Sequence, residues 1–459
     1  MKVSVILAAG EGTRMKSKKP KVLHEILGRP MLFYVLNSCK HSQIEKNIVV
    51  VGHNKEKVLG AFEEEENVEF IEQPIGKDVP YGTGFAVLNA INKINDEDTV
   101  IILNGDTPII SDSTISCFLK FHEERNNDVT VLSADLKDPT NYGRIVRDGN
   151  AKVVAIVEEK DASEKQKLIR EINSGIFAFK GKSLKYALSQ IKTDNAANEM
   201  YITDALGILV ENGEKVDSFK LRDTREILGV NSRYELSIAA EILQEKINKE
   251  YMLKGVGIVD PKSTYIELGA EIEKDVMIYP GTCIDKNSVI KEGTSIYSST
   301  IINSTIEEDV TIKSSEIEDS KVGSGTTVGP YAHLRPNSNV GKNCKVGNFV
   351  EIKNSNIGDK SKMSHLAYVG DADVGSGVNI GCGVVFVNYN GKEKFRSKVG
   401  DNAFIGSNAN LVAPVEVQDN GYVAAGSTIT KDVLKGQLSL ERAPQKNIDG
   451  WVKRKGFLK

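Results

Sequence analysis

The pattern of hydrophobic and polar positions divides the 459-residue chain into two parts with different periods. Up to about residue 220, short β-branched segments alternate with segments of helical period. The expected strands are Val3–Leu7, Asn47–Val51, Thr99–Leu103, Asp128–Ser133 and Gly175–Phe179, and the expected helices are Pro30–Cys39, Lys55–Glu65 and Thr83–Lys93. Apolar strands separated by helices predict an open, mostly parallel α/β sheet, in which ligands bind beyond the carboxyl ends of the strands.

One longer amphipathic helix is predicted over residues 232–254. Apolar side chains recur there at intervals of three and four residues, which places them on one helical face. They are Leu236, Ala239, Ala240, Leu243, Ile247 and Tyr251. We interpret this helix as a link between two domains.

Beyond this helix the apolar period changes to six. The aliphatic series are Ile278, Ile284, Ile290, Ile296 and Ile302, then Val322, Val328, Leu334, Val340, Val346 and Ile352, then Val399, Ile405, Leu411, Val417, Val423 and Ile429. This period is typical of a parallel β-helix of hexapeptide repeats, in which each coil buries its aliphatic side chains against its neighbours. We interpret the breaks in the period at 302–312 and 352–374 as insertions, and the second break contains His365.

Composition narrows the kinds of partner that the chain binds. Lys and Arg number 59 against 63 Asp and Glu, so no overall positive charge gathers nucleic acid or an anionic membrane. No segment reaches the roughly 20 apolar residues of a membrane span. The five cysteines form no C-x-x-C pair, which argues against a disulfide framework or a structural zinc site and favours a reducing cytoplasm.

A glycine-rich basic loop, LAAGEGTRMKSKKPKVL (Leu7–Leu23), begins at the end of the first predicted strand. It lacks the third glycine of a dinucleotide fingerprint and the G-K-[ST] of a P-loop. The backbone N–H groups of such a turn, with Arg14 and Lys21, can bind phosphate oxygens, although a solvated basic loop would have the same composition. A second glycine turn at Tyr81–Gly84, and Asp106 after a buried strand, favour a phosphate site with a magnesium ligand.

Together these motifs resemble one family along nearly the whole chain. The stretches that carry the resemblance are L-A-A-G-x-G-T-R-M, P-K-V-L-H, G-T-G, N-G-D, N-Y-G-R-I, V-E-E-K-D-A and E-I-N-S-G-I, followed by the helix and the hexapeptide repeats. The chain is similar to the bifunctional bacterial enzymes that join N-acetylglucosamine-1-phosphate uridylyltransferase to glucosamine-1-phosphate N-acetyltransferase. The first glycine motif alone would indicate only the wider sugar-nucleotide pyrophosphorylase family.

The resemblance implies a Rossmann-like α/β nucleotidyltransferase domain over residues 1–231, the linking helix over 232–254, and a left-handed parallel β-helix N-acetyltransferase domain with a C-terminal tail over 255–459. It implies acetyl transfer from acetyl-CoA to glucosamine-1-phosphate, then uridylyl transfer from UTP to N-acetylglucosamine-1-phosphate with release of pyrophosphate. A cytoplasmic homotrimer without nucleic acid or membrane partners is the expected assembly.

In the first domain, the resemblance assigns contacts with UTP and the UDP-sugar to Leu7, Ala8, Ala9, Gly10, Arg14, Lys21, Gln73, Gly82, Thr83, Gly143, Glu158, Asn173 and Asn231. It assigns Mg²⁺ to Asp106 and Asn231. The chain departs from the family pattern in a longer loop at 74–81 and in Phe85, where histidine is usual. These departures concern the role of Gln73 as a reader of uracil and leave the metal assignment unaffected.

In the second domain, the resemblance assigns to His365 the role of the base that takes a proton from the sugar amine, a task that suits the pKa of histidine. Ser407 is expected to stabilise the developing oxyanion. Contacts with glucosamine-1-phosphate fall on Arg335, Lys353, Tyr368 and Asn379, and contacts with acetyl-CoA on Cys382, Asn388, Tyr389, Ser407, Ala425 and Arg442. The basic end at 451–455 either forms a free tail or completes a neighbour's site.

Two other functions are considered. One is a pyrophosphorylase like glucose-1-phosphate adenylyltransferase, with a non-catalytic solenoid; such enzymes lack the segment of His365 and the loop Asn388–Gly391. The other is a non-enzymatic scaffold or exchange-factor subunit. That function predicts the loss of Arg14, Lys21 or Asp106, and all three are present.

Overall fold

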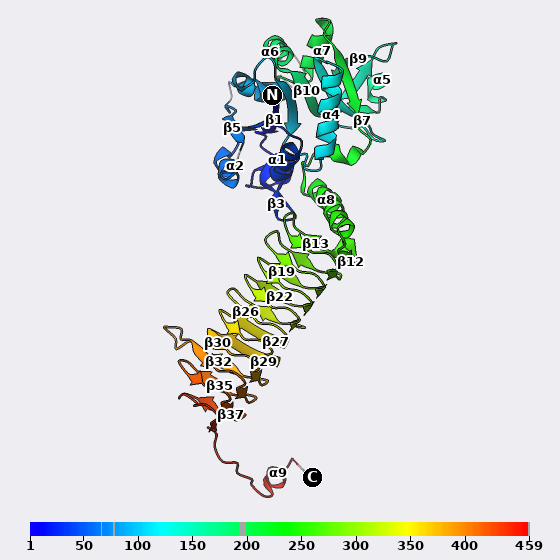
Figure 1. The fold of residues 1–459 in the computed structure, drawn as a ribbon. Coiled ribbons are helices and arrows are strands. Elements are labelled where there is room, and N and C mark those ends of the chain that lie inside the picture. Colours follow the sequence, from blue (N-terminus) through cyan, green and yellow to red (C-terminus); the bar gives the residue numbers. More distant parts are fainter. Residues whose placement is uncertain (66, 77–78, 192–198, 458–459) are drawn as a thin grey trace. The chain divides into compact units, whose positions relative to one another are not determined.

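The computed structural model describes residues 1–459 except 66, 77–78, 192–198 and 458–459 (Figure 1). The chain divides into two compact units, Met1–Leu243 and Gln244–Lys459. The division falls inside helix α8 (Arg233–Leu253), which confirms the long helix predicted over 232–254. Each unit is described by itself.

The first unit is built on a mixed sheet with the strand order β11-β7-β10-β6-β1-β4-β5. These strands are β1 (Lys2–Ala8), β4 (Lys46–Val51), β5 (Val68–Glu72), β6 (Thr99–Asn104), β7 (Val129–Asp135), β10 (Glu171–Lys180) and β11 (Val216–Lys220). Two further strands, β8 (Arg144–Arg147) and β9 (Val153–Val157), pair with each other, and β8 also pairs with β10. Strands β6, β1, β4 and β5 are parallel, whereas β10 runs antiparallel to β6 and β7. The five predicted strands and the mostly parallel sheet are confirmed.

Hydrophobic cores lie on both faces of this sheet, because side chains alternate along each strand. On β1, Ile6 packs into one core with Leu32 of α1 (Met31–His41), and Val5 packs into the other with Val87 of α3 (Thr83–Ala90). The remaining helices of this unit include α2 (Lys55–Ala61), α4 (Asp112–Glu124), α6 (Gly181–Gln190) and α7 (Asp204–Glu211). Helix α2 is shorter than predicted, since Phe62 leaves the helix and enters the core.

The second unit is a stack of short parallel strands, from β12 (Gly257–Ile258) to β39 (Leu438–Ser439), as the predicted β-helix requires (Figure 1). The aliphatic series points inward as predicted: Ile278, Leu334 and Ile405 are fully buried, like the other members of their series except one. That exception is Ile302, which is 37% exposed, while Ile301 beside it is fully buried. The assignment of Ile302 to the core was therefore wrong.

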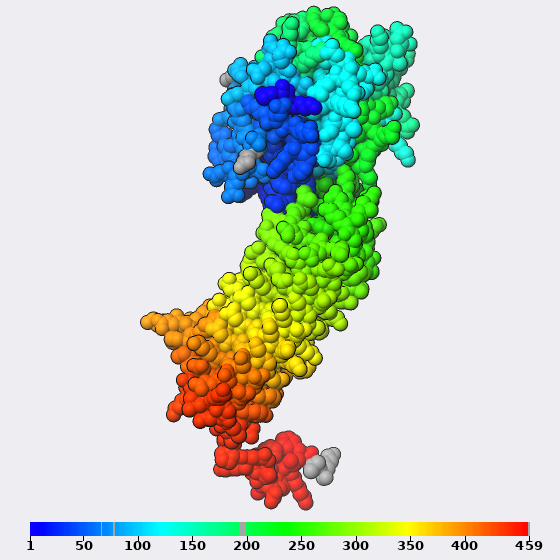
Figure 2. All heavy atoms as spheres, viewed as in Figure 1, coloured from blue at the N-terminus to red at the C-terminus, as the bar shows by residue number. Residues whose placement is uncertain are grey.

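The breaks in the six-residue period are shortened coils, and the prediction of insertions at these places was wrong. Buried side chains follow one another at Ile296, Ile301, Ile306, Ile312, Ile317 and Val322, and again at Val346, Ile352, Ile357, Met363, Val369 and Val374. His365 thus lies within a regular strand, β29 (Lys362–Gly370), in register with β27 (Lys345–Lys353). The long extra segment is instead residues 388–396, which project from the β-helix (orange in Figure 2).

The last turns of α8 cover the first coils of the β-helix. The side-chain amides of Gln244 and Asn248 donate to the carbonyl of Thr264 at 2.8 and 2.9 Å, and the hydroxyl of Tyr251 donates to the carbonyl of Ala270 at 2.6 Å. These bonds satisfy backbone groups at an end of the stack that would otherwise be open.

All five cysteines are free thiols, in agreement with the absence of a disulfide framework. Among the described residues, no helix combines the length and the apolar character that crossing a membrane demands. The cytoplasmic location stays a prediction.

Candidate active sites

The first unit carries a pocket of about 290 Å³ at the carboxyl ends of β1 and β6. It is lined by Leu7, Ala9, Gly10, Lys21, Val22, Gln73, Tyr81, Gly82, Thr83, Ala86, Asn104, Asp106 and Glu199. Eight of the residues predicted for UTP, the UDP-sugar or the metal therefore share one pocket: Leu7, Ala9, Gly10, Lys21, Gln73, Gly82, Thr83 and Asp106. Ala8 instead turns its side chain into the core.

The two predicted metal ligands face a single lysine in this unit. The ammonium of Lys21 contacts the Asp106 carboxylate and donates to Oδ1 of Asn231 at 3.0 Å, and Arg14 donates to the same Oδ1 at 2.8 Å. The backbone N–H of Val230 donates to the carbonyl of Asp106 at 2.9 Å, which fixes the two chain segments together. A carboxylate and an amide oxygen thus converge on one cationic position, and such oxygens are the donors that Mg²⁺ takes.

A glycine turn closes another side of the pocket. Gly82 has φ +117°, and a Cβ atom there would lie 2.4 Å from the carbonyl oxygen of Met200. The N–H of Gly84 donates to that carbonyl at 2.7 Å, and Oγ1 of Thr83 accepts from the N–H of Ile202 at 3.1 Å. The glycines of G-T-G are therefore required because the backbone of residues 200–202 lies directly against them.

Of the predicted sugar contacts, Gly143 directly precedes β8, Glu158 directly follows β9, and Asn173 lies on β10; these three strands adjoin one another. A Cβ atom on Gly143 would lie 3.2 Å from Glu158 Oε1, and the N–H of Asn173 donates to the carbonyl of Gly143 at 2.8 Å. Burial raises the pKa of Glu158; Asp204 and Asp161 raise it further, while a hydrogen bond from Thr203 opposes the shift. These three residues are not among those that line the 290 Å³ pocket.

In the second unit, His365 is exposed on β29 and is held by a residue that the sequence did not single out. Its Nδ1 lies 2.8 Å from Oδ1 of Asn348, the residue beside it on β27. With the amide oxygen as acceptor, Nδ1 carries the hydrogen and Nε2 keeps its lone pair. This is the tautomer that a base acting through Nε2 requires.

A group of three positive side chains includes the last residue of β27, the strand paired with that of His365. Lys353 ends β27, and its pKa is lowered chiefly by contact with and repulsion from Lys394, and further by burial and by Arg335. Arg335 donates to Oε1 of Glu351 at 2.7 Å. Lys394 lies on the projecting 388–396 segment and was not predicted; no period or motif in that segment marks it. Three converging cations favour an anion such as a phosphate.

Asn388 lies close to Tyr368, although the two were assigned to different ligands. The Asn388 side chain is buried, donates to the Asp371 carboxylate and lies 3.5 Å from the hydroxyl of Tyr368. Asn379 stands on β31 (Asn379–Ile380), paired with Lys362 on the neighbouring coil. Tyr389 is 54% exposed and donates to the carbonyl of Gly391 at 2.7 Å, so this ring does not join the Asn388 cluster.

Three of the predicted acetyl-CoA residues follow one another along one corner of successive coils. The N–H of Asn408 donates to the carbonyl of Cys382 at 2.7 Å, and the N–H of Gly426 donates to that of Ser407 at 2.8 Å. These bonds stack Cys382, Ser407 and Ala425, and Arg442 donates to the carbonyl of Ala425 at 2.8 Å. His365 lies on the preceding coil, where Leu366 accepts from Gly383 at 2.6 Å.

Comparison with known proteins agrees with this division. A family model described as nucleotidyl transferase matches residues 3–238, and one described as bacterial transferase hexapeptide matches residues 319–354 and 396–431. A solved structure of a putative glucose-1-phosphate thymidylyltransferase from Bacillus anthracis covers 52% of this chain and 94% of its own at 19% identity. Its TM-score of 0.43 is too low to add to the assignment.

Full-length relatives are closer. "Bifunctional protein GlmU" of Clostridioides difficile is 48% identical over 98% of this chain and 97% of its own. "Bifunctional protein GlmU" of Alkaliphilus oremlandii is 50% identical over 99% of each. These matches favour the predicted pair of transferases over the pyrophosphorylase with a non-catalytic solenoid and over the scaffold subunit. The chain belongs to the bifunctional GlmU family, as its sequence predicted.

Proposed function

We propose that this chain makes UDP-N-acetylglucosamine in two steps: acetyl transfer from acetyl-CoA to glucosamine-1-phosphate, then uridylyl transfer from UTP to the acetylated product. The observation that carries the proposal is the contact of Nδ1 of His365 with Asn348, which leaves Nε2 as the basic nitrogen. The strand paired with that of His365 ends in Lys353, which interacts with Lys394 and Arg335. A base and a phosphate-binding group of cations are what N-acetylation of an amino-sugar phosphate requires.

In the acetyl transfer, the amine nitrogen attacks the thioester carbonyl carbon, the C–N bond forms and the C–S bond breaks. Nε2 of His365 takes the proton from the amine, and the departing sulfur is released as the thiol after protonation. Asn348 keeps the imidazole in the productive tautomer by accepting from Nδ1. Ser407 lies at the same corner two coils further along, and we assign it to the developing oxyanion.

In the uridylyl transfer, an oxygen of the sugar phosphate attacks the α-phosphorus of UTP, and the bond to pyrophosphate breaks. We assign Arg14 and Lys21 to the triphosphate. We assign Gln73, Gly82 and Thr83, which line the pocket, to the uracil base. Glu158 and Asn173 bind the acetylated sugar, and we keep Gly143 with them because it makes room for the Glu158 carboxylate.

Asp106 and Asn231 are the residues that would hold Mg²⁺. Their side-chain oxygens already share one cationic partner, Lys21, so the donor set fits a hard cation. When bound there, Mg²⁺ would neutralise charge on the phosphates. Lys21 and Arg14 would still bind phosphate oxygens, and both donate hydrogen bonds to Asn231.

We also assign a homotrimer to the chain. Large apolar side chains are exposed at one corner of three successive coils: Tyr331 (62%), Phe349 (57%) and Leu366 (56%). A continuous apolar ridge on a protein surface is typical of an interface. The test is the mass in solution by light scattering, which should equal three times the 50.2 kDa chain; a monomer would contradict the trimer.

The direct test of the two reactions is to offer glucosamine-1-phosphate, acetyl-CoA, UTP and Mg²⁺ together and to detect UDP-N-acetylglucosamine by mass spectrometry. Omitting acetyl-CoA should stop both the acetylated and the uridylylated products. Supplying N-acetylglucosamine-1-phosphate instead should restore the second step alone. Turnover of glucose-1-phosphate with ATP, without any acetyl transfer, would contradict the proposal.

A further inference from the structure

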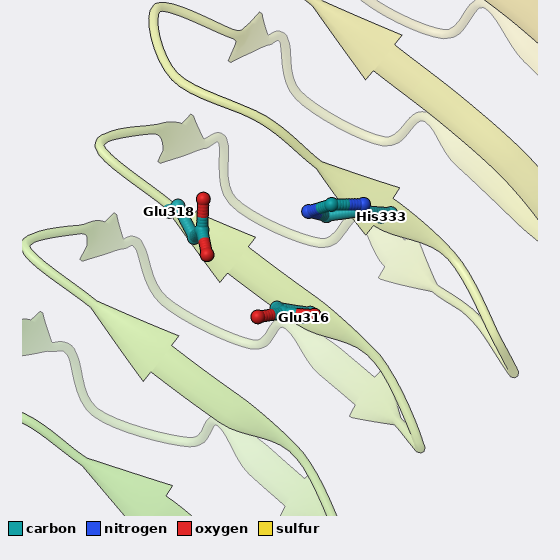
Figure 3. Close-up of side chains that lie close together, drawn as sticks. All are labelled: Glu316, Glu318 and His333. Atoms are coloured by element: carbon teal, nitrogen blue, oxygen red, sulfur yellow. The ribbon is translucent and has the colours of Figure 1, made fainter.

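A group of three metal-ligating side chains on the β-helix, none of them assigned a role above, lies on two neighbouring coils. Glu316 and Glu318 stand on β22 (Glu316–Glu318), and His333 stands on the adjacent β25 (His333–Leu334), directly opposite Glu316 (Figure 3). One ligand atom of each lies within 4.8 Å of the others. From this geometry we propose that the three side chains bind a divalent transition-metal ion of the Zn²⁺ class.

The histidine supplies the first argument. Nε2 of His333 is shielded from solvent and has no hydrogen-bond partner among the described residues. A buried polar nitrogen without a partner costs free energy unless something outside the chain satisfies it. Because the neighbouring Glu316 and Glu318 side chains are negatively charged, a ligand that satisfies this nitrogen should be a cation.

The two carboxylates supply the second argument. Within the described residues, neither Glu316 nor Glu318 has an ion pair or a side-chain hydrogen bond. Arg335, whose charge acts on Glu318, donates instead to Glu351 at 2.7 Å. Two like charges on one face of a short strand, with no ion pair among the described residues, are stabilised by a cation held between them.

The kind of ion follows from the donor atoms. An imidazole nitrogen with two carboxylate oxygens is a donor set that Zn²⁺ takes, whereas Mg²⁺ and Ca²⁺ prefer oxygen alone. Three protein ligands would leave a further position for water. Because the ligands come from two successive coils, the ion would also join these coils.

The test is zinc binding to the full chain, stripped of metal with a chelator and dialysed against Zn²⁺ in excess Mg²⁺. The excess Mg²⁺ occupies oxygen sites such as Asp106 and Asn231, so the assay does not depend on the proposed function. The wild type should bind one more equivalent of Zn²⁺ per chain than either His333→Gln or Glu316→Gln. Controls are His53→Gln, which changes an exposed histidine of the first unit, and Glu308→Gln, which changes a glutamate of the β-helix that accepts a hydrogen bond from Ser324.

Cobalt gives an independent readout of the same site. Co²⁺ bound through His333 should give visible absorption in the wild type and in both controls, and this absorption should be lost in His333→Gln. Circular dichroism should show that all variants are folded, since the three side chains lie outside the buried ladder of Ile317 and Leu334. Equal zinc stoichiometry in the wild type, His333→Gln and Glu316→Gln would overturn the proposal.

Discussion

Asn348 and His365 stand side by side on consecutive coils, 17 residues apart, with Oδ1 of the amide 2.8 Å from Nδ1 of the imidazole. This contact leaves Nε2 as the nitrogen that can take a proton. It also fixes the orientation of a ring that is otherwise exposed to solvent. The geometry makes Asn348 a positioning residue for the proposed base.

Replacing Asn348 should therefore impair the base without removing it. Asn348→Ala should lower kcat for acetyl transfer by roughly 10- to 100-fold, with little change in KM, because the imidazole loses its orientation. Asn348→Asp should move the acid limb of the pH–rate profile to higher pH, since a carboxylate stabilises the imidazolium. The matched control is Asn339→Ala, which removes a similar bond across coils, to Asn356 at 2.9 Å; a loss of equal size there would count against positioning.

His365→Ala should separate the two activities. Loss of a general base costs about 10²–10⁴ in rate, so acetyl transfer should fall by this factor. Uridylyl transfer should stay within a few-fold, because its residues lie in the other compact unit, Met1–Leu243. Each activity is measured alone, the second with N-acetylglucosamine-1-phosphate supplied. A parallel fall of both in a folded variant would disprove the assignment of separate sites.

The sequence predicted most of the fold because the apolar periods were long and regular. It assigned Ile302 to the core because either of two adjacent isoleucines could continue the buried series. Only the spacing of five residues from Ile296, which the structure shows, identifies Ile301 as the buried one. It also interpreted shortened coils as insertions. In a period of six residues, a repeat that is one residue short and a repeat that is five residues too long shift the apolar positions by the same phase. It missed Asn348 and Lys394, whose roles depend on strand register and on a projecting segment, neither of which a linear pattern contains.

Asp106→Ala should abolish magnesium-dependent release of pyrophosphate. The Asp106 carboxylate holds Lys21 and is proposed to hold Mg²⁺, and both neutralise charge on the phosphates. Its removal is expected to lower kcat by at least about 100-fold. A coupled pyrophosphate assay measures the loss, and acetyl transfer by the same protein shows that it is intact. Asp138→Ala, which changes a carboxylate bonded to Thr140 in a loop, should retain full activity. Undiminished pyrophosphate release in Asp106→Ala would rule this residue out as a ligand.

Glu158 should make sugar binding sensitive to mild acid. Its pKa is raised above the ordinary value, chiefly by burial, so the carboxylate is lost at a higher pH than for an exposed glutamate. KM for N-acetylglucosamine-1-phosphate should therefore rise as pH falls through that raised pKa, and Glu158→Gln should flatten this pH dependence.

The stability of the fold should depend on pH in the opposite direction. The folded state holds the proton of Glu158 more tightly than the unfolded state, so the free energy of unfolding falls as pH rises from the unfolded-state pKa to the folded-state pKa. Thermal melts of wild type and Glu158→Gln across that range check this sign.

Gly82→Ala should damage the nucleotide pocket. The added methyl group would meet the Met200 carbonyl at 2.4 Å, and φ +117° is unfavourable for alanine. We expect a higher KM for UTP and a lower melting temperature. Gly60→Ala is the control, since its Cβ atom meets nothing within 4 Å and it lies in helix α2, where alanine is favoured by roughly 0.5–1 kcal/mol. An unchanged KM for UTP in Gly82→Ala would show that the turn tolerates displacement.

The pairing of each coil with the next has a consequence for synthesis. A nascent chain can close one turn of about 17 residues at a time on a finished template, which keeps the entropic cost of each closure small. The strand that carries Asn348 leaves the ribosome before the strand that carries His365, so the imidazole meets its acceptor as soon as its own coil is laid down. Ser407 and Ala425 follow, and the acetyl-transfer centre is completed long after every residue assigned to the nucleotide site has emerged.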